Sequence, residues 1–105
     1  MRDIHRHAAA LEAALPEMLA LSARAVNIGS GSYMPAGVNA VIDLWAGMLA
    51  GMGFAGERSP LPGFGDQMTA RLRPGGNGPR LLILGHADTV WPAGTVAEWP
   101  FARDG

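Results

Sequence analysis

One short run of the sequence constrains the fold of this chain more than any other. Residues 81–84 read Leu-Leu-Ile-Leu, so the side chains on both faces of this segment are apolar. Such a run is typical of a central strand that other layers cover on each side. We therefore predict a buried strand at residues 80–85. A chain of 105 residues is at most one small domain, so we expect this strand to belong to a larger protein.

The composition is typical of a folded protein and does not favour binding to nucleic acid or to a membrane. Hydrophobic residues make up 49% of the chain and charged residues 16%, which is typical of a protein with a core. The formal net charge of −1 gives no field that would attract nucleic acid or anionic lipid. Glu12, Pro16 and Glu17 interrupt the Ala- and Leu-rich start, unlike a signal peptide. We expect a cytoplasmic location.

Two helices are expected before the sheet. Apolar residues recur at helical spacing through residues 4–26, and Pro16 marks a kink or a fresh start there. Residues 1–15 are interpreted as a frayed helical extension. A second helix is predicted from Pro35 to the glycines at 51 and 53. Its apolar face consists of Val38, Val41, Ile42, Trp45, Met48, Leu49 and Met52.

The remaining chain predicts a small sheet. Residues 54–58 indicate a brief strand, and residues 67–73 alternate between apolar and polar side chains, as a half-buried strand does. The Gly-rich residues 74–79 then favour a hairpin in which 67–73 and 80–85 pair antiparallel. The predicted fold class is α/β, with two N-terminal helices followed by a small mixed sheet.

The polar residues after the apolar run are the main candidates for chemistry. His86 and Asp88 directly follow the predicted central strand, where ligands bind in open α/β sheets. If the backbone stays extended, both side chains project to one side with Cα atoms roughly 6.5 Å apart. The carboxylate can then hold one imidazole nitrogen and leave the other for a metal. From spacing alone, a purely structural role for His86 and Asp88 is the commoner outcome.

The wider context resembles a known family. Residues 82–90, Leu-Ile-Leu-Gly-His-Ala-Asp-Thr-Val, resemble the first metal-site motif of the zinc-dependent aminoacylase, acetylornithine deacetylase and carboxypeptidase G superfamily. Residues 26–32, the helix after them, Gly53-Phe54 and residues 99–105 follow in the order of that family. The resemblance covers roughly residues 16–105 and is greatest to the glutamate carboxypeptidase branch. This context favours a functional role for His86.

The resemblance implies a fold, a cofactor and a substrate class. Residues 1–105 would be the N-terminal portion of a catalytic domain that is a three-layer α/β/α structure when complete. His86 would be a zinc ligand, and Asp88 a catalytic-site residue that contacts this ligand and poises the site. The complete enzyme would hold a pair of zinc ions, hydrolyse the amide bond of a peptide or an N-acyl amino acid, and assemble as a homodimer.

The sequence also departs from the family. The bridging Asp, the general-base Glu and the other ligands of the family lie beyond the end of this sequence. The chain has no Cys, and one imidazole does not replace the roughly three or four protein ligands of a zinc site. Met34 stands before Pro35 where relatives usually carry a polar capping residue. We therefore expect the 105 residues alone to be inactive.

Other candidates have simpler interpretations. His5 and His7 point in different directions on a helix and indicate a solvated helix start. Residues 29–32, Gly-Ser-Gly-Ser, follow a helix and not a strand, which favours an interhelical loop over a phosphate cradle or a serine nucleophile. Trp91 and Trp99 would either line a substrate cleft or pack at the base of the catalytic domain. Asp104 is expected in a turn with the glycine after it.

Two alternatives to a peptidase stay open at this point. The chain could be a free-standing, non-catalytic interaction module that pairs its sheet with another chain. It could also be part of a deacetylase or desuccinylase, because the residues that would grip the acyl group are not among these 105. Exposure of the apolar residues 81–84 would separate a partial domain from a complete one.

Overall fold

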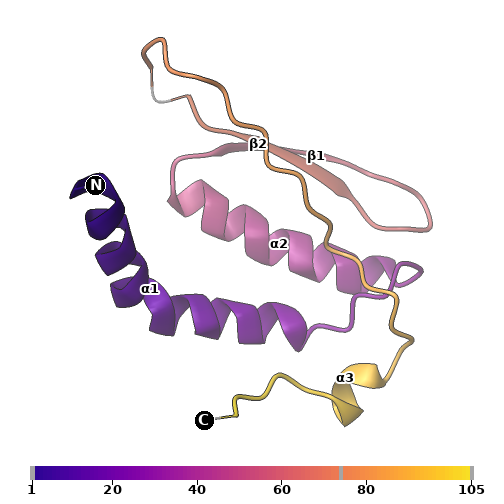
Figure 1. The fold of residues 1–105 in the computed structure, drawn as a ribbon. Helices are drawn as coiled ribbons and strands as arrows, with labels where there is room; N and C mark the ends of the chain where they lie inside the picture. Colours follow the sequence, from indigo (N-terminus) through magenta and orange to yellow (C-terminus); the bar gives the residue numbers. More distant parts are fainter. Residues whose placement is uncertain (1, 74, 105) are drawn as a thin grey trace.

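The computed structural model describes residues 2–73 and 75–104. Its elements follow the order of two long helices, two strands and one short helix (Figure 1). They are α1 (Arg2–Val26), α2 (Pro35–Gly51), β1 (Ala55–Ser59), β2 (Gln67–Arg71) and α3 (Thr95–Glu98). The two N-terminal helices and the small sheet after them confirm the predicted α/β class.

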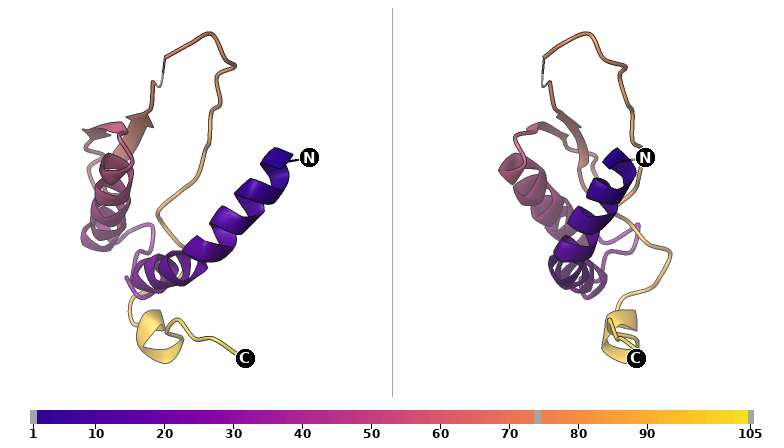
Figure 2. Two further views of the ribbon diagram at one scale, coloured as in Figure 1. Left: turned by 90° about the vertical axis from the view of Figure 1, so that its left-hand side faces the viewer. Right: turned by 60° about the vertical axis from the view of Figure 1, so that its left-hand side comes forward.

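Helix α1 runs without interruption through Pro16. Because proline has no amide hydrogen and its ring crowds the preceding turn, it bends a helix that it does not end. The bend separates the indigo and purple parts of α1 in Figure 1 and is visible again in Figure 2. The predicted kink is therefore present, and residues 2–15 are helical. In the described part of the chain, no helix combines the length and apolar character required to cross a bilayer.

Helix α2 carries the core of the described structure. Pro35 occupies its first turn, and Met34 stands at the N-cap without a side-chain hydrogen bond, as the sequence led us to expect. Val38, Val41 and Ile42 are buried. They lie at the i, i+3 and i+4 positions of one apolar stripe, which is how a helix packs one face against a sheet.

The sheet is an antiparallel hairpin of β1 and β2, in which Ala55 pairs with Arg71 and Ser59 with Gln67. The alternation expected in β2 is confirmed, because Met68 and Ala70 are half-buried and their neighbours are exposed. Helix α2 lies against one face of this hairpin (Figure 1). The brief strand expected at residues 54–58 is thus present, displaced by one residue.

The prediction of a strand at residues 80–85 is wrong. This segment has no strand structure, and the hairpin partner of β2 is β1. Figure 2 shows this segment as a separate arm that lies away from the sheet. The side chains of Leu81, Leu82, Ile83 and Leu84 are 91%, 82%, 91% and 84% exposed. A strand with two apolar faces needs a paired neighbour and a layer on each side, and the described residues supply neither to this segment.

We expect the exposed residues 81–84 to make the 105-residue chain self-associate. Burying one large aliphatic side chain is worth about 1.5–3 kcal/mol, so contact between two such segments is favourable. Light scattering and the fluorescence of a hydrophobic dye should both fall in the variant Leu81→Lys/Ile83→Lys. The matched control, Ala9→Lys/Ala13→Lys, adds the same charge on exposed positions of α1. Equal scattering from the two variants would contradict this expectation.

Candidate functional site

The loop between α1 and α2 lies against the segment that carries His86 and Asp88. The Ser32 amide donates a hydrogen bond to the Thr89 carbonyl at 3.0 Å, and the Thr89 amide donates to the Ser30 carbonyl at 2.8 Å. These bonds form an isolated parallel bridge between Gly31 and Thr89. A Cβ on Gly31 would lie 2.7 Å from the Trp91 carbonyl oxygen, closer than packed atoms permit. The absence of a side chain there therefore lets the two segments approach.

The His86 and Asp88 side chains project to the same side of the backbone. The His86 Nδ1 atom lies 2.8 Å from the Asp88 carbonyl oxygen and 3.3 Å from its carboxylate Oδ1. Both of these oxygens are acceptors, so the network assigns the proton to Nδ1 and leaves a free lone pair on Nε2. The His86 side chain is 81% exposed. The imidazole is therefore accessible from solvent.

Ser32 holds the other oxygen of the same carboxylate. Its hydroxyl donates a hydrogen bond to Asp88 Oδ2 at 2.6 Å, across 56 positions of sequence. This hydrogen bond, helped by the nearby His86 imidazole, lowers the pKa of Asp88 below its ordinary value against the opposing effect of desolvation. Asp88 is therefore ionised at neutral pH and interacts favourably with the imidazole.

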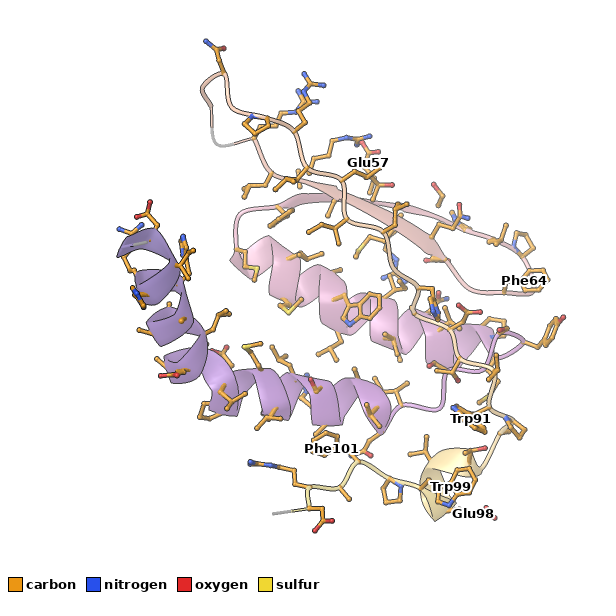
Figure 3. All side chains as sticks on the ribbon, viewed as in Figure 1. Glu57, Phe64, Trp91, Glu98, Trp99 and Phe101 are labelled. Carbon is orange, nitrogen blue, oxygen red and sulfur yellow. The ribbon has the colours of Figure 1, made fainter. Side chains whose placement is uncertain are left out.

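His86 and Asp88 stand at a depression of about 510 Å³. Its polar lining includes Ser32 and Asp66, and its apolar lining comes mainly from α2 and from the connection between β1 and β2. Phe64, at the tip of that connection in Figure 3, packs on Tyr33 with ring centroids 5.6 Å apart. The depression therefore combines an apolar wall with a polar edge, as ligand sites commonly do.

Arg58 joins three segments of the chain beside the depression. Its guanidinium forms ion pairs with Asp43 on α2 and with Asp66 at the end of the connection between β1 and β2, the latter at 2.9 Å. The Asp66 amide also donates to Asn39 Oδ1 at 2.7 Å. Helix α2, strand β1 and the segment before β2 are thus joined at one point next to the candidate site.

The residues present fit one part of a zinc site. Imidazole nitrogen is a common zinc ligand, and a carboxylate on the second ring nitrogen is its usual partner. Among residues 2–73 and 75–104, no group of three or more His, Cys, Asp or Glu side chains is arranged to hold a metal ion. The described chain therefore offers one oriented nitrogen donor and not a complete ligand set.

Apart from Ser32, the other candidates lie outside the depression. His5 and His7 are exposed on α1, and residues 29–32 form the interhelical loop that we expected. Trp91 and Trp99 pack edge to face near α3, with ring centroids 5.7 Å apart (Figure 3). Neither lines the depression. The expected turn at Asp104 involves residue 105, which lies outside the described residues.

Comparison with known proteins gives one distant relative. The chain is 30% identical over 92 residues to carboxypeptidase G2 of Pseudomonas sp. (strain RS-16). The alignment covers 86% of this chain and 22% of that protein, so the chain spans less than a quarter of the relative. No family model matches the chain, and no solved structure matches it. The similarity indicates a distant carboxypeptidase-like relationship across most of this chain.

Proposed function

We propose that residues 1–105 are the N-terminal portion of a zinc-dependent metallohydrolase that cleaves amide bonds. The observation that supports it is the His86 imidazole, whose Nδ1 lies 2.8 and 3.3 Å from two Asp88 oxygens while the side chain stays exposed at a depression. The distant similarity to a carboxypeptidase agrees with this class of reaction. The proposed substrate is a small peptide or N-acyl amino acid with a free carboxylate, as in a glutamate carboxypeptidase.

Each residue of the pair has a distinct part in this proposal. His86 binds zinc through Nε2, and Asp88 fixes the ring orientation and the tautomer through Nδ1. When bound, zinc would polarise the substrate carbonyl and lower the pKa of a water molecule toward neutrality. The further ligands and the general base would come from protein outside this sequence. A deacetylase or desuccinylase would use the same pair, so this pair does not select the acyl group.

A non-catalytic interaction module is the competing proposal. The exposure of Leu81 to Leu84 speaks against a complete module, because exposed apolar side chains of this kind are expected of a partial domain. The coding sequence downstream of residue 105 separates the two proposals. A metallohydrolase requires an in-frame Asp-bearing loop followed by a Glu-Glu pair, whereas a stop codon would favour the module.

We expect the purified 105-residue chain to show no amidase turnover in added zinc. One oriented imidazole falls short of the roughly three or four protein ligands that zinc needs, so zinc would be bound too weakly to act. Hydrolysis of an N-acyl glutamate can be followed by release of the free amine. Turnover that survives repeated purification and disappears in His86→Ala would contradict this expectation.

A further inference from the structure

We propose that Ser32 is a positioning residue that orients His86 through Asp88; this inference rests on the proposed function. The two oxygens of the Asp88 carboxylate face different donors. Oδ2 receives the Ser32 hydroxyl at 2.6 Å, and Oδ1 lies 3.3 Å from His86 Nδ1. A carboxylate free to rotate would present either oxygen, or neither, to the imidazole. The Ser32 hydrogen bond therefore selects the rotamer that places the charged Oδ1 beside the imidazole, whose Nδ1 also lies 2.8 Å from the Asp88 carbonyl oxygen.

The geometry favours the carboxylate as the acceptor of the Ser32 proton. The hydroxyl oxygen also lies 3.2 Å from the Thr89 carbonyl, but a serine hydroxyl has only one proton to donate. The bond to Asp88 is shorter, and hydrogen bonds to an ionised acceptor are about twice as strong as neutral ones. The Thr89 carbonyl already accepts the Ser32 amide at 3.0 Å. The Ser32 hydroxyl therefore donates its proton to the Asp88 carboxylate.

The backbone around Ser32 is held independently of its side chain. The bridge between Gly31 and Thr89 consists of two main-chain bonds, one from the Ser32 amide to the Thr89 carbonyl and one from the Thr89 amide to the Ser30 carbonyl. Removal of the hydroxyl therefore leaves the two segments together but releases the carboxylate. If Ser32 had only a structural role, its replacement would leave the tautomer of His86 unchanged.

The test is the tautomer of His86, measured by nitrogen-15 NMR of the 105-residue chain at alkaline pH. Spectra are recorded at a concentration where light scattering reports a monomer. The exposed His5 and His7 on α1 give internal references in the same spectrum. We expect wild-type His86 to carry its proton on Nδ1, and Ser32→Ala to shift its tautomer ratio toward that of His5 and His7. Ser32→Thr, which keeps a hydroxyl, should retain the wild-type ratio.

The matched control is Ser22→Ala, which removes an exposed hydroxyl from α1 and should change nothing. An unchanged His86 tautomer in Ser32→Ala, with the Ser32 and Thr89 amides still protected from exchange, would overturn the inference. If the amides lose their protection from exchange in Ser32→Ala, the variant Ser32→Cys is measured instead. Its thiol is a weak hydrogen-bond donor, so the tautomer ratio of His86 should shift in this variant too. A wild-type ratio in Ser32→Cys would overturn the inference.

The inference and the proposed function can fail separately. In the complete gene product, Ser32→Ala should weaken zinc binding by about tenfold, the lower end of the effect of partners behind a metal ligand. If His86→Ala abolishes zinc binding and Ser32→Ala leaves both zinc affinity and tautomer unchanged, only the role of Ser32 is wrong. If His86→Ala leaves zinc affinity unchanged, the proposed function itself is wrong.

Discussion

The complete gene product should lose at least about 10³-fold in kcat/KM for amide hydrolysis when His86 is replaced by Ala. A zinc ion contributes several kcal/mol of charge stabilisation to such a reaction, and each 1.36 kcal/mol corresponds to about tenfold in rate. Loss of one ligand from a set of about four removes or misplaces that ion. Removal of zinc from the wild type with a chelator should produce a loss of the same size, reversed by added zinc.

The variant Asp88→Asn tests the second member of the pair. It keeps the shape of the side chain but removes the charge that faces His86 Nδ1 at 3.3 Å. We expect a loss of about 10-fold to 100-fold, as for other partners of metal-binding histidines. His7→Ala, on the exposed part of α1, is the control and should retain full activity. Full activity in His86→Ala would exclude the proposed role of this residue.

Among the described glycines, Gly37 should be the one whose replacement by Ala destabilises the chain most. A Cβ on Gly37 would overlap the Gly29 carbonyl oxygen, and it would also lie 2.9 Å from the Gly29 carbonyl carbon. Both atoms belong to the backbone, which cannot yield as a flexible side chain does. Overpacking of this kind costs about 3 kcal/mol or more. The loop that carries Ser32 would have to move away from α2.

Gly47 provides the matched control for Gly37. It lies in the same helix, and a Cβ there would meet no atom within 4 Å. Gly47→Ala should therefore stabilise the chain by up to about 1 kcal/mol, because alanine favours the helix over glycine. Denaturation followed by circular dichroism would compare the two variants. A free energy of unfolding for Gly37→Ala equal to that for Gly47→Ala would contradict the contact between Gly29 and α2.

The sequence predicts the helices and the local part of the site because both depend on near neighbours. The apolar spacing around Val38 and Ile42 and the proline at 35 suffice to define α2. The contact between His86 and Asp88 follows from two residues in an extended chain. The strand at residues 80–85 could not be judged in this way, because strand formation depends on partners and covering layers.

Ser32 shows the opposite limit. Its partner Asp88 lies 56 positions away, and no spacing rule joins a loop after one helix to a segment that follows a hairpin. The sequence around Ser32 predicts an interhelical loop and no role in chemistry for its hydroxyl. The close approach of Gly31 to Trp91 brings the Ser32 hydroxyl to the Asp88 carboxylate. This approach is visible only in the folded chain.

The most direct test of the central claim is an experimental structure of the complete gene product with zinc bound. We predict a zinc ion about 2.0–2.1 Å from His86 Nε2, with Nδ1 of the same ring facing Asp88. A zinc ion bound through Nδ1, or a fully loaded metal centre that does not include His86, would contradict the account.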